Sequence, residues 1–269
     1  AHMDMVPQKN NDKVHNFETD PIETIIDGDW VRANGTTLGA DNCIGVAAGM
    51  AIIESKDIQH GPLELFITAD EETGMYGAFG LEPGTLQGKL LMNMDSEDFG
   101  ELYVGCAGGM DANIEWKYQG VALPVGDIAL KVNITGLKGG HSGLEINLGR
   151  ANANKLLFRF LREAISQYEA RLAKVEGGNM RNAIPREAYA IITVPAEARE
   201  EIEKLVEEYR DLFNEEYKVT ENPIIFTCEE VEAPEMLIPE EIQDDLINAV
   251  TACPNGVFRM IPAIPDTVE

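Results

Sequence analysis

The first hundred residues alternate between short β-prone runs and one apolar helix, and this alternation restricts the possible folds most strongly. Residues 63–68, 90–94 and 102–106 are β-prone and are bounded by glycine, proline or acidic residues. Residues 41–53 are apolar almost all round, which is typical of a helix buried against a sheet, and Asp41 stands where an N-cap would stand. Strands that alternate with such a helix predict an α/β sheet covered on both faces.

The remainder of the chain has a different pattern. Helices with one apolar stripe follow strands with alternating side chains, which predicts an α+β domain with helices on one face of an antiparallel sheet. We therefore expect two domains, residues 1–110 and 111–269. The predicted strands of the second domain cover residues 128–135, 188–194 and 223–231, and its predicted helices cover residues 147–175, 197–212 and 240–250.

The charge and the cysteine content exclude several classes of protein. The chain has 21 Lys+Arg and 47 Asp+Glu, a net charge of −26, which argues against binding to nucleic-acid phosphates or anionic membranes. No apolar run approaches the roughly 18 residues that span a bilayer. The four cysteines are too scattered for a disulfide framework or a Cys-x-x-Cys zinc site, which fits a reducing cytoplasm.

Four short acidic motifs end a β-prone run or open the predicted helix. In open α/β sheets such positions can converge beyond the carboxyl ends of the strands. In extended chain His2 and Asp4 share one face, so His2 can ligate a metal ion while Asp4 orients its ring. Imidazole and carboxylates together suit zinc, cobalt or manganese. The motifs are His2-Met3-Asp4, Asp41-Asn42, Glu71-Glu72 and Asp95.

Each motif taken alone also has a plainer interpretation. Residues 1–3 could be left over from an expression vector, and Asp41 could only cap a helix. Glu71 and Glu72 could form a solvated turn, and residues 95–98 an acidic surface cluster. The order and spacing of the motifs together are more specific than any one of them.

This order resembles the pattern of the co-catalytic zinc peptidase family, which contains aminoacylases, carnosinases, di- and tripeptidases and deacylases. Residues 139–143 (GGHSG) are similar to the histidine motif of the family's lid domain, and residues 182–185 (NAIP) to its lid strand motif. The resemblance covers essentially the whole chain. It is most detailed toward the bacterial aminoacyl-histidine dipeptidases, in the segments AHMDMVPQK, GADNCIG, TADEETGM, GGHSGLEINLGRANA and GGNMRNAIPRE.

The resemblance implies a role for each matching residue. Two divalent metal ions, zinc before cobalt or manganese, would be held by four residues, and Asp41 would bridge the ions. Glu71 would take a proton from the attacking water and pass it to the leaving amine, and Asp4 would hold the His2 ring. His141 would stabilise the oxyanion and Asn182 would contact the substrate. The implied metal ligands are His2, Asp41, Glu72 and Asp95.

The resemblance also implies parts that this sequence lacks. The family has sheet strands before its His-x-Asp motif and a last metal-binding histidine after the lid, whereas His141 is the last histidine here. We therefore expect the sequence to be an internal portion of a longer protein, with an incomplete sheet and an incomplete lid.

The implied activity is hydrolysis of the peptide bond of dipeptides, those ending in histidine among them. A deacylase or a tripeptidase of the same family is the nearest alternative, and a metal-free binding or dimerisation module is the alternative from another class. A glycosidase with paired carboxylates leaves His2 unexplained, and the two tryptophans offer few surfaces for sugar stacking. The family also implies a homodimer formed through the lid domain.

Overall fold

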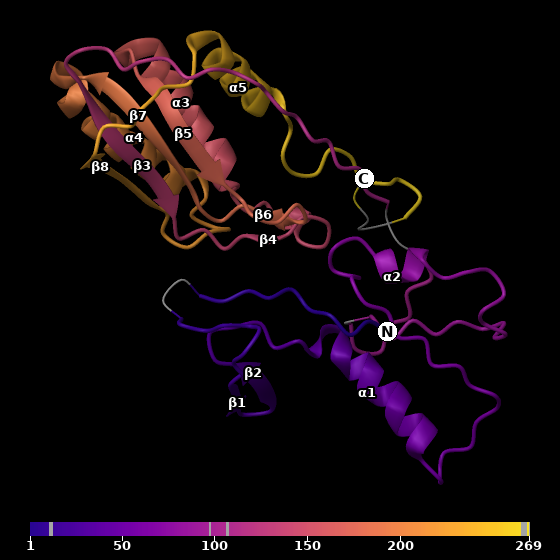
Figure 1. Cartoon of the computed structure of the whole chain (residues 1–269). Helices are drawn as coiled ribbons and strands as arrows, with labels where there is room; N and C mark the ends of the chain where they lie inside the picture. The colour runs from indigo at the N-terminus through magenta and orange to yellow at the C-terminus, as the bar shows by residue number, and fades with distance from the viewer. Residues whose placement is uncertain (11–12, 97, 106–107, 265–267, 269) are drawn as a thin grey trace. The chain divides into compact units, whose positions relative to one another are not determined.

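The computed structural model of the chain (Figure 1) describes residues 1–10, 13–96, 98–105, 108–264 and 268. The chain divides into two units, Ala1–Gly108 and Gly109–Glu269, and this division lies close to the one expected from the sequence. Glu97 of the predicted acidic cluster and Cys106 of a predicted strand lie outside the described residues. Both units contain helices and strands, in agreement with the predicted mixed α/β class.

The second unit is built on a four-stranded antiparallel sheet with the strand order β5-β7-β3-β8. In the central strand β3 the side chains of Leu130, Val132 and Ile134 are fully buried, whereas Lys131 and Asn133 point to the opposite face. The strands are β3 (Asp127–Thr135), β5 (Arg171–Gly177), β7 (Ala188–Pro195) and β8 (Ile225–Val231).

Three helices pack against this sheet and against one another. Helices α3 and α4 cover one face, and α5 packs on α3 and β5 (Figure 1). Phe160 of α3 lies at the centre of the core, with its ring edge-on to Phe226 at 5.1 Å between centroids. The predicted antiparallel sheet with helices is therefore confirmed. The helices are α3 (Ala153–Tyr168), α4 (Arg199–Glu216) and α5 (Glu240–Ala252).

The predicted helix over residues 147–175 is wrong at both ends. Asn152 caps α3 by accepting a hydrogen bond from the Lys155 backbone N–H at 3.2 Å, and Glu169, at φ 54°, ends the helix. The residues that follow form β5, in which Leu172 pairs with Ile192 of β7. The spacing of Leu172 and Val175 fits a helical stripe, but the open edge of β7 offers backbone hydrogen bonds that a longer helix could not use.

We expect Phe160→Ala to lower the free energy of unfolding of the second unit by about 3–5 kcal/mol, because it empties a fully buried aromatic site. Urea denaturation followed by circular dichroism measures this loss. Val219→Ala, at a side chain that is 86% exposed, is the matched control and should stay within about 0.5 kcal/mol of the parent. Equal effects of the two changes would contradict this description of the core.

The first unit contains less regular structure than predicted. Its elements are the hairpin β1 (Thr24–Asp27) and β2 (Trp30–Ala33), the helix α1 (Ala40–Glu54) and the short helix α2 (Tyr76–Phe79). Helix α1 agrees with the predicted position, but Ile44, Met50 and Ile53 are exposed, so the predicted burial of this helix is wrong.

Within the described residues, the three β-prone runs of the first unit form no ladder. Thr68 alone takes part in strand-like pairing, in an isolated parallel bridge with His2. Leu90, Leu91 and Met92 are largely exposed. A β-prone run becomes a strand only where a neighbouring segment supplies hydrogen bonds along it, and these runs do not pair with one another.

The buried residues of the first unit lie in one place. Among its described residues only His2, Asn42 and Gly45 are buried, and two of these carry polar side chains. Buried polar side chains are more informative than exposed apolar ones. The most buried point of this unit is thus a polar site and not a hydrophobic core.

Among the described helices of the whole chain, none has the length and apolar character needed to cross a membrane.

Candidate metal centre

Four segments far apart in the sequence bring the predicted residues together. The N-terminal residues run parallel to residues 66–68, since the Met3 N–H donates to the Thr68 carbonyl at 3.0 Å and the Thr68 N–H to the Ala1 carbonyl at 3.1 Å. This pairing sets His2 beside the turn that follows, which carries Glu71 and Glu72. Asp70 opens that turn at φ 57°.

The start of α1 supplies the third segment. Asp41 has φ −86° and ψ 110°, which is not helical, and the N-cap position is held by Gly39 without a side-chain hydrogen bond. Such angles also occur at N-cap positions, but the Asp41 carboxylate lies 3.3 Å from His2 Nε2 and, among the described residues, accepts no hydrogen bond from the α1 backbone. The expectation that Asp41 only caps the helix is therefore wrong. The peptide bond between Asp41 and Asn42 is cis, and the Asp41 carboxylate faces His2 instead of the helix backbone.

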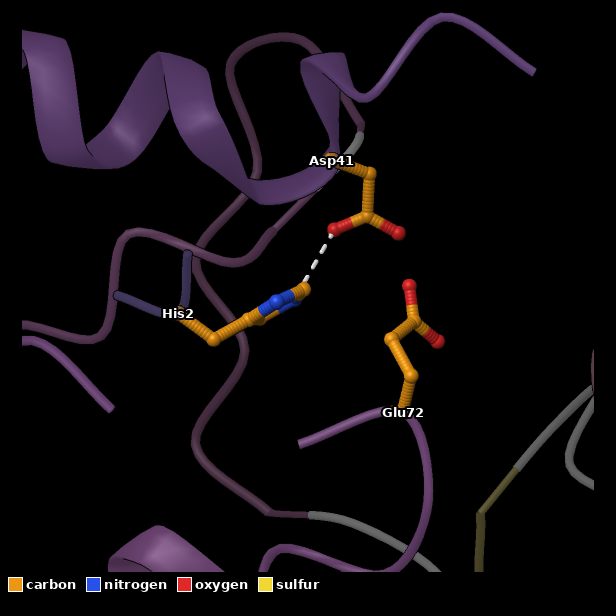
Figure 2. Close-up of side chains that lie close together, drawn as sticks. All are labelled: His2, Asp41 and Glu72. Carbon is orange, nitrogen blue, oxygen red and sulfur yellow. Dashed lines mark ion pairs between the residues drawn. The ribbon is translucent and has the colours of Figure 1, made fainter. Parts of the chain in front are cut away.

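His2 lies at the centre of the cluster, with 2% of its surface exposed. Its Nε2 atom is 3.3 Å from Asp41 Oδ1 and 3.5 Å from Asp95 Oδ1, and 3.8 Å from Glu71 Oε2. Figure 2 shows the side chains of His2, Asp41 and Glu72 converging, with the pair between His2 and Asp41 marked. The structure thus brings His2, Asp41, Glu71, Glu72 and Asp95 to one point.

Asp4 lies on the other side of the imidazole ring. His2 Nδ1 is 3.0 Å from the Asp4 carbonyl oxygen and 3.5 Å from Asp4 Oδ1. Because a carbonyl oxygen only accepts, Nδ1 carries the proton in the neutral ring and Nε2 presents its lone pair to the acidic residues. Asp4 Oδ2 also accepts a hydrogen bond from the Glu72 N–H at 3.1 Å, so Asp4 fastens the Glu71-Glu72 turn to the His2 segment.

Bringing these side chains together shifts their pKa values. Burial raises the pKa of Asp95, Glu71 and Glu72, and neighbouring carboxylates raise it further, although His2 opposes the shift. Burial lowers the pKa of His2, but Asp95 and the Asp4 carbonyl outweigh it, so that the net shift is upward. Carboxylates held together in this way attract any positive charge that fits between them.

The donor set fits a divalent metal ion. One ligand atom from each of His2, Asp41 and Glu72 lies within 4.8 Å of the others. The ligand atoms of four-coordinate zinc lie about 3–4 Å apart, given bonds of about 2.0–2.2 Å. The spacing of the triad is thus close to that of ligand atoms around a metal ion, and one imidazole with carboxylates is a donor set that zinc, cobalt and manganese accept.

Helix α1 packs closely against the segment that carries Asp95, through Asn42 and Gly45. No role was expected for these two residues from the sequence. Asn42 is 3% exposed and its Nδ2 donates to the Met94 carbonyl at 2.7 Å. A Cβ atom on Gly45 would lie 2.9 Å from Met94 Cβ, so only glycine allows this approach. The position of Asn42 directly after Asp41, and of Gly45 one turn later, was the available signal.

His141 and Asn182 lie in the second unit, so their predicted contacts with the substrate remain predictions. The structure brings the two residues close to each other. Strand β4 (Gly140–His141) pairs with β6 (Ala183–Ile184), and the Ser142 N–H donates to the Asn182 carbonyl at 2.9 Å. The two lid motifs expected from the sequence therefore form one local structure.

Comparisons with known proteins agree with the resemblance read from the motifs. The cytosol non-specific dipeptidase of Escherichia coli is 45% identical over 269 residues, which are all of this chain and 56% of that protein. The crystal structure of aminoacylhistidine dipeptidase from Vibrio alginolyticus is also 45% identical, with a TM-score of 0.66, covering all of this chain and 55% of that one. An uncharacterized Bacillus subtilis protein is 26% identical over 80% of this chain.

This chain thus spans about half the length of the curated relatives it matches. Residues 132–221, which include most of the sheet of the second unit and the helices α3 and α4, match the model of the peptidase dimerisation domain of the M20 peptidases. The identity to dipeptidases over all 269 residues extends this likeness through the His2 cluster. The chain is therefore similar to the M20 peptidases, in residues 132–221 to their dimerisation domain and over its whole length to part of two dipeptidases.

Proposed function

We propose that this chain supplies the metal-binding residues and the lid domain of a metal-dependent dipeptidase. The observation that carries the proposal is the convergence of His2 with Asp41, Asp95 and the Glu71-Glu72 pair in a unit where little else is buried. The identity of 45% to proteins named as dipeptidases supports the substrate class. Residues 1–110 belong in this proposal to the catalytic domain and residues 111–269 to the lid.

His2, Asp41, Glu72 and Asp95 are the residues that would hold two divalent ions, preferably zinc and otherwise cobalt or manganese. Bound there, the ions would supply Lewis acidity to the scissile carbonyl group and to a water molecule. Asp4 keeps the proton of His2 on Nδ1, so that Nε2 stays free to act as a ligand.

Glu71 is the general base of the proposed reaction. Its Oε2 atom lies 3.8 Å from His2 Nε2, farther than the facing oxygens of Asp41 and Asp95, and this position supports a role in proton exchange rather than as a ligand. Burial and the charge of Asp95 raise the pKa of Glu71 above its ordinary value, and this favours both acceptance and release of a proton near neutral pH. Glu71 takes a proton from the attacking water and delivers it to the nitrogen of the leaving amine.

His141 donates a hydrogen bond to the oxyanion that develops on the scissile carbonyl, and Asn182 contacts the substrate. Support for His141 comes from its Nδ1 atom, which accepts hydrogen bonds from the Gly143 and Leu144 N–H groups, both at 3.0 Å. A ring that accepts at Nδ1 carries its proton on Nε2 in the neutral form. Its remaining nitrogen is thus a donor, as stabilisation of an oxyanion requires.

The proposal also covers the oligomeric state, the location and the partners of the enzyme. A homodimer formed through the second unit is supported by the match of residues 132–221 to a dimerisation domain. A cytoplasmic location is supported by the name of the Escherichia coli relative, a cytosol dipeptidase. The strongly negative net charge of the chain agrees with small peptides rather than nucleic acids as its partners.

The proposal is tested on the full-length protein, stripped of metal with a chelator and then given Zn²⁺, Co²⁺ or Mn²⁺. We expect hydrolysis of β-alanyl-histidine and other dipeptides to disappear on chelation and to return with metal. An acylated amino acid and a tripeptide serve as competing substrates. Faster turnover of either would favour the deacylase or tripeptidase alternative, and no hydrolysis with no bound metal would favour a binding module.

We expect Gly45→Ala to weaken zinc binding without unfolding the protein. The added methyl group would lie 2.5 Å from Asn42 Oδ1 and 2.9 Å from Met94 Cβ, and it would push the Asp95 segment away from Asp41. Isothermal titration with Zn²⁺ should show a loss of about tenfold or more in affinity, as other changes that displace metal ligands do. Gly61→Ala is the matched control, because nothing lies within 4 Å of its added Cβ, and it should bind zinc as the parent does.

A further inference from the structure

The segment that carries His141 is held at both ends by one buried carboxylate. Glu221 lies far along the chain, between α4 and β8, with 8% of its surface exposed. Its Oε2 accepts the Lys138 N–H at 2.8 Å and its Oε1 accepts the Ala151 N–H at 2.9 Å. The two donors bracket residues 139–150, so the carboxylate closes this stretch into a loop.

A second set of contacts lies inside this loop. Arg150 donates from Nη1 to the Gly139 carbonyl at 2.6 Å, and its Nη2 is 2.7 Å from Glu145 Oε1. The other oxygen of Glu145 accepts the His141 N–H at 2.9 Å. A Cβ on Gly140 would lie 2.5 Å from Arg150 Nη1 and 2.8 Å from Glu145 Oε2, which shows how closely the pair encloses the backbone beside His141.

The turn that orients the His141 ring lies inside this loop. Its Nδ1 accepts from the Gly143 and Leu144 N–H groups only while residues 141–144 keep their tight turn. A carboxylate that accepts two backbone N–H groups does so through both oxygens, which an amide side chain cannot repeat, because its nitrogen is a donor. Glu221 therefore satisfies a backbone N–H at each end of the loop at once.

We propose that Glu221 is a positioning residue for His141: by closing residues 138–151 into a loop, it keeps the His141 ring in the tautomer that offers Nε2–H to the substrate. This inference rests on the proposed function, in which His141 stabilises the oxyanion. The residue acts through the loop and does not itself touch the substrate. Its effect should appear in kcat more than in KM, since a donor aimed at developing charge acts in the transition state.

The test compares Glu221→Gln with the matched control Glu215→Gln in the full-length, metal-loaded protein. Glu215 lies in the same region, at the end of α4, but its side chain is exposed and pairs only locally, with Lys218. Protein labelled with ¹⁵N-histidine gives one signal set for each histidine, and His141→Ala identifies the one of interest. We expect His141 to show the single Nε2–H tautomer in the parent and in the control, and a mixture of tautomers in Glu221→Gln.

Steady-state kinetics on a dipeptide should show a fall in kcat of about tenfold or more for Glu221→Gln, with little change in KM. Glu145→Gln, at a partly exposed residue of the same loop, should change the His141 signals in the same direction and guards against a folding defect at the buried site. Unchanged His141 signals in both variants would overturn the proposal, whatever the activity. Altered signals with unchanged kcat would uphold the positioning role and count against the oxyanion role of His141.

Discussion

Glu71→Gln should reduce the turnover of dipeptides by about 10²-fold or more, while the protein still binds its metal ions. Glutamine keeps the size of the side chain but cannot accept the proton that the attacking water loses. The change alters none of the four proposed ligands, His2, Asp41, Glu72 and Asp95, so we expect metal binding to be retained. Steady-state kinetics and elemental analysis of the same sample measure both quantities.

Glu54→Gln is the matched control, because Glu54 is an exposed residue at the end of α1 in the same unit. It should retain parental kcat and metal content. Turnover near the parental rate in Glu71→Gln would show that another group accepts the proton. Loss of metal together with activity would show that Glu71 is a ligand and that its partner in the pair, Glu72, is the better candidate for the base.

The second unit was largely predictable from the sequence, because its elements bury alternating or helical apolar patterns against one another. The helix predicted over residues 147–175 was too long because the apolar spacing at its end fits either a helix or a strand. Leu172 forms a strand there because it pairs with the edge of β7. In the first unit the β-prone runs predicted a sheet, but strand formation depends on neighbours that a local pattern does not reveal. Strand propensity alone therefore gave a wrong prediction for these runs.

The candidate site was predictable as a set of residues but not as a packing arrangement. The motifs named His2, Asp41 and Glu72, which converge in the structure. The backbone carbonyl of Asp4 lies nearer to the His2 ring than its carboxylate does, and no motif predicts that. The roles of Asn42 and Gly45 depend on how closely α1 approaches Met94, a tertiary contact that sequence spacing does not encode.

Asp41→Ala should abolish tight zinc binding and the stabilisation that zinc confers. Asp41 lies 3.3 Å from His2 Nε2 and shares the triad with Glu72, so its loss removes the group that joins the other ligands. We expect the affinity for Zn²⁺ to fall by about 100-fold or more, beyond the 10- to 100-fold typical of residues that only support a ligand. A ligand at 100 times its Kd stabilises a protein by about 2.7 kcal/mol, and this gain should vanish from the thermal melting curve.

The metal-free form separates this effect from misfolding. Asp41 raises the pKa of Asp95, through a hydrogen bond and repulsion, and that of Glu72 through repulsion, so its removal relieves both groups. The contacts of His2 with Asp95 and Glu71, at 3.5 and 3.8 Å, do not involve Asp41. Metal-free Asp41→Ala should therefore melt no lower than metal-free parent protein, although it melts well below the parent in saturating zinc. Asp57→Ala, at an exposed residue beyond α1, should follow the parent in both states. A variant that binds zinc as tightly as the parent would remove Asp41 from the centre, whereas a lower melting temperature without metal would make its role one of folding.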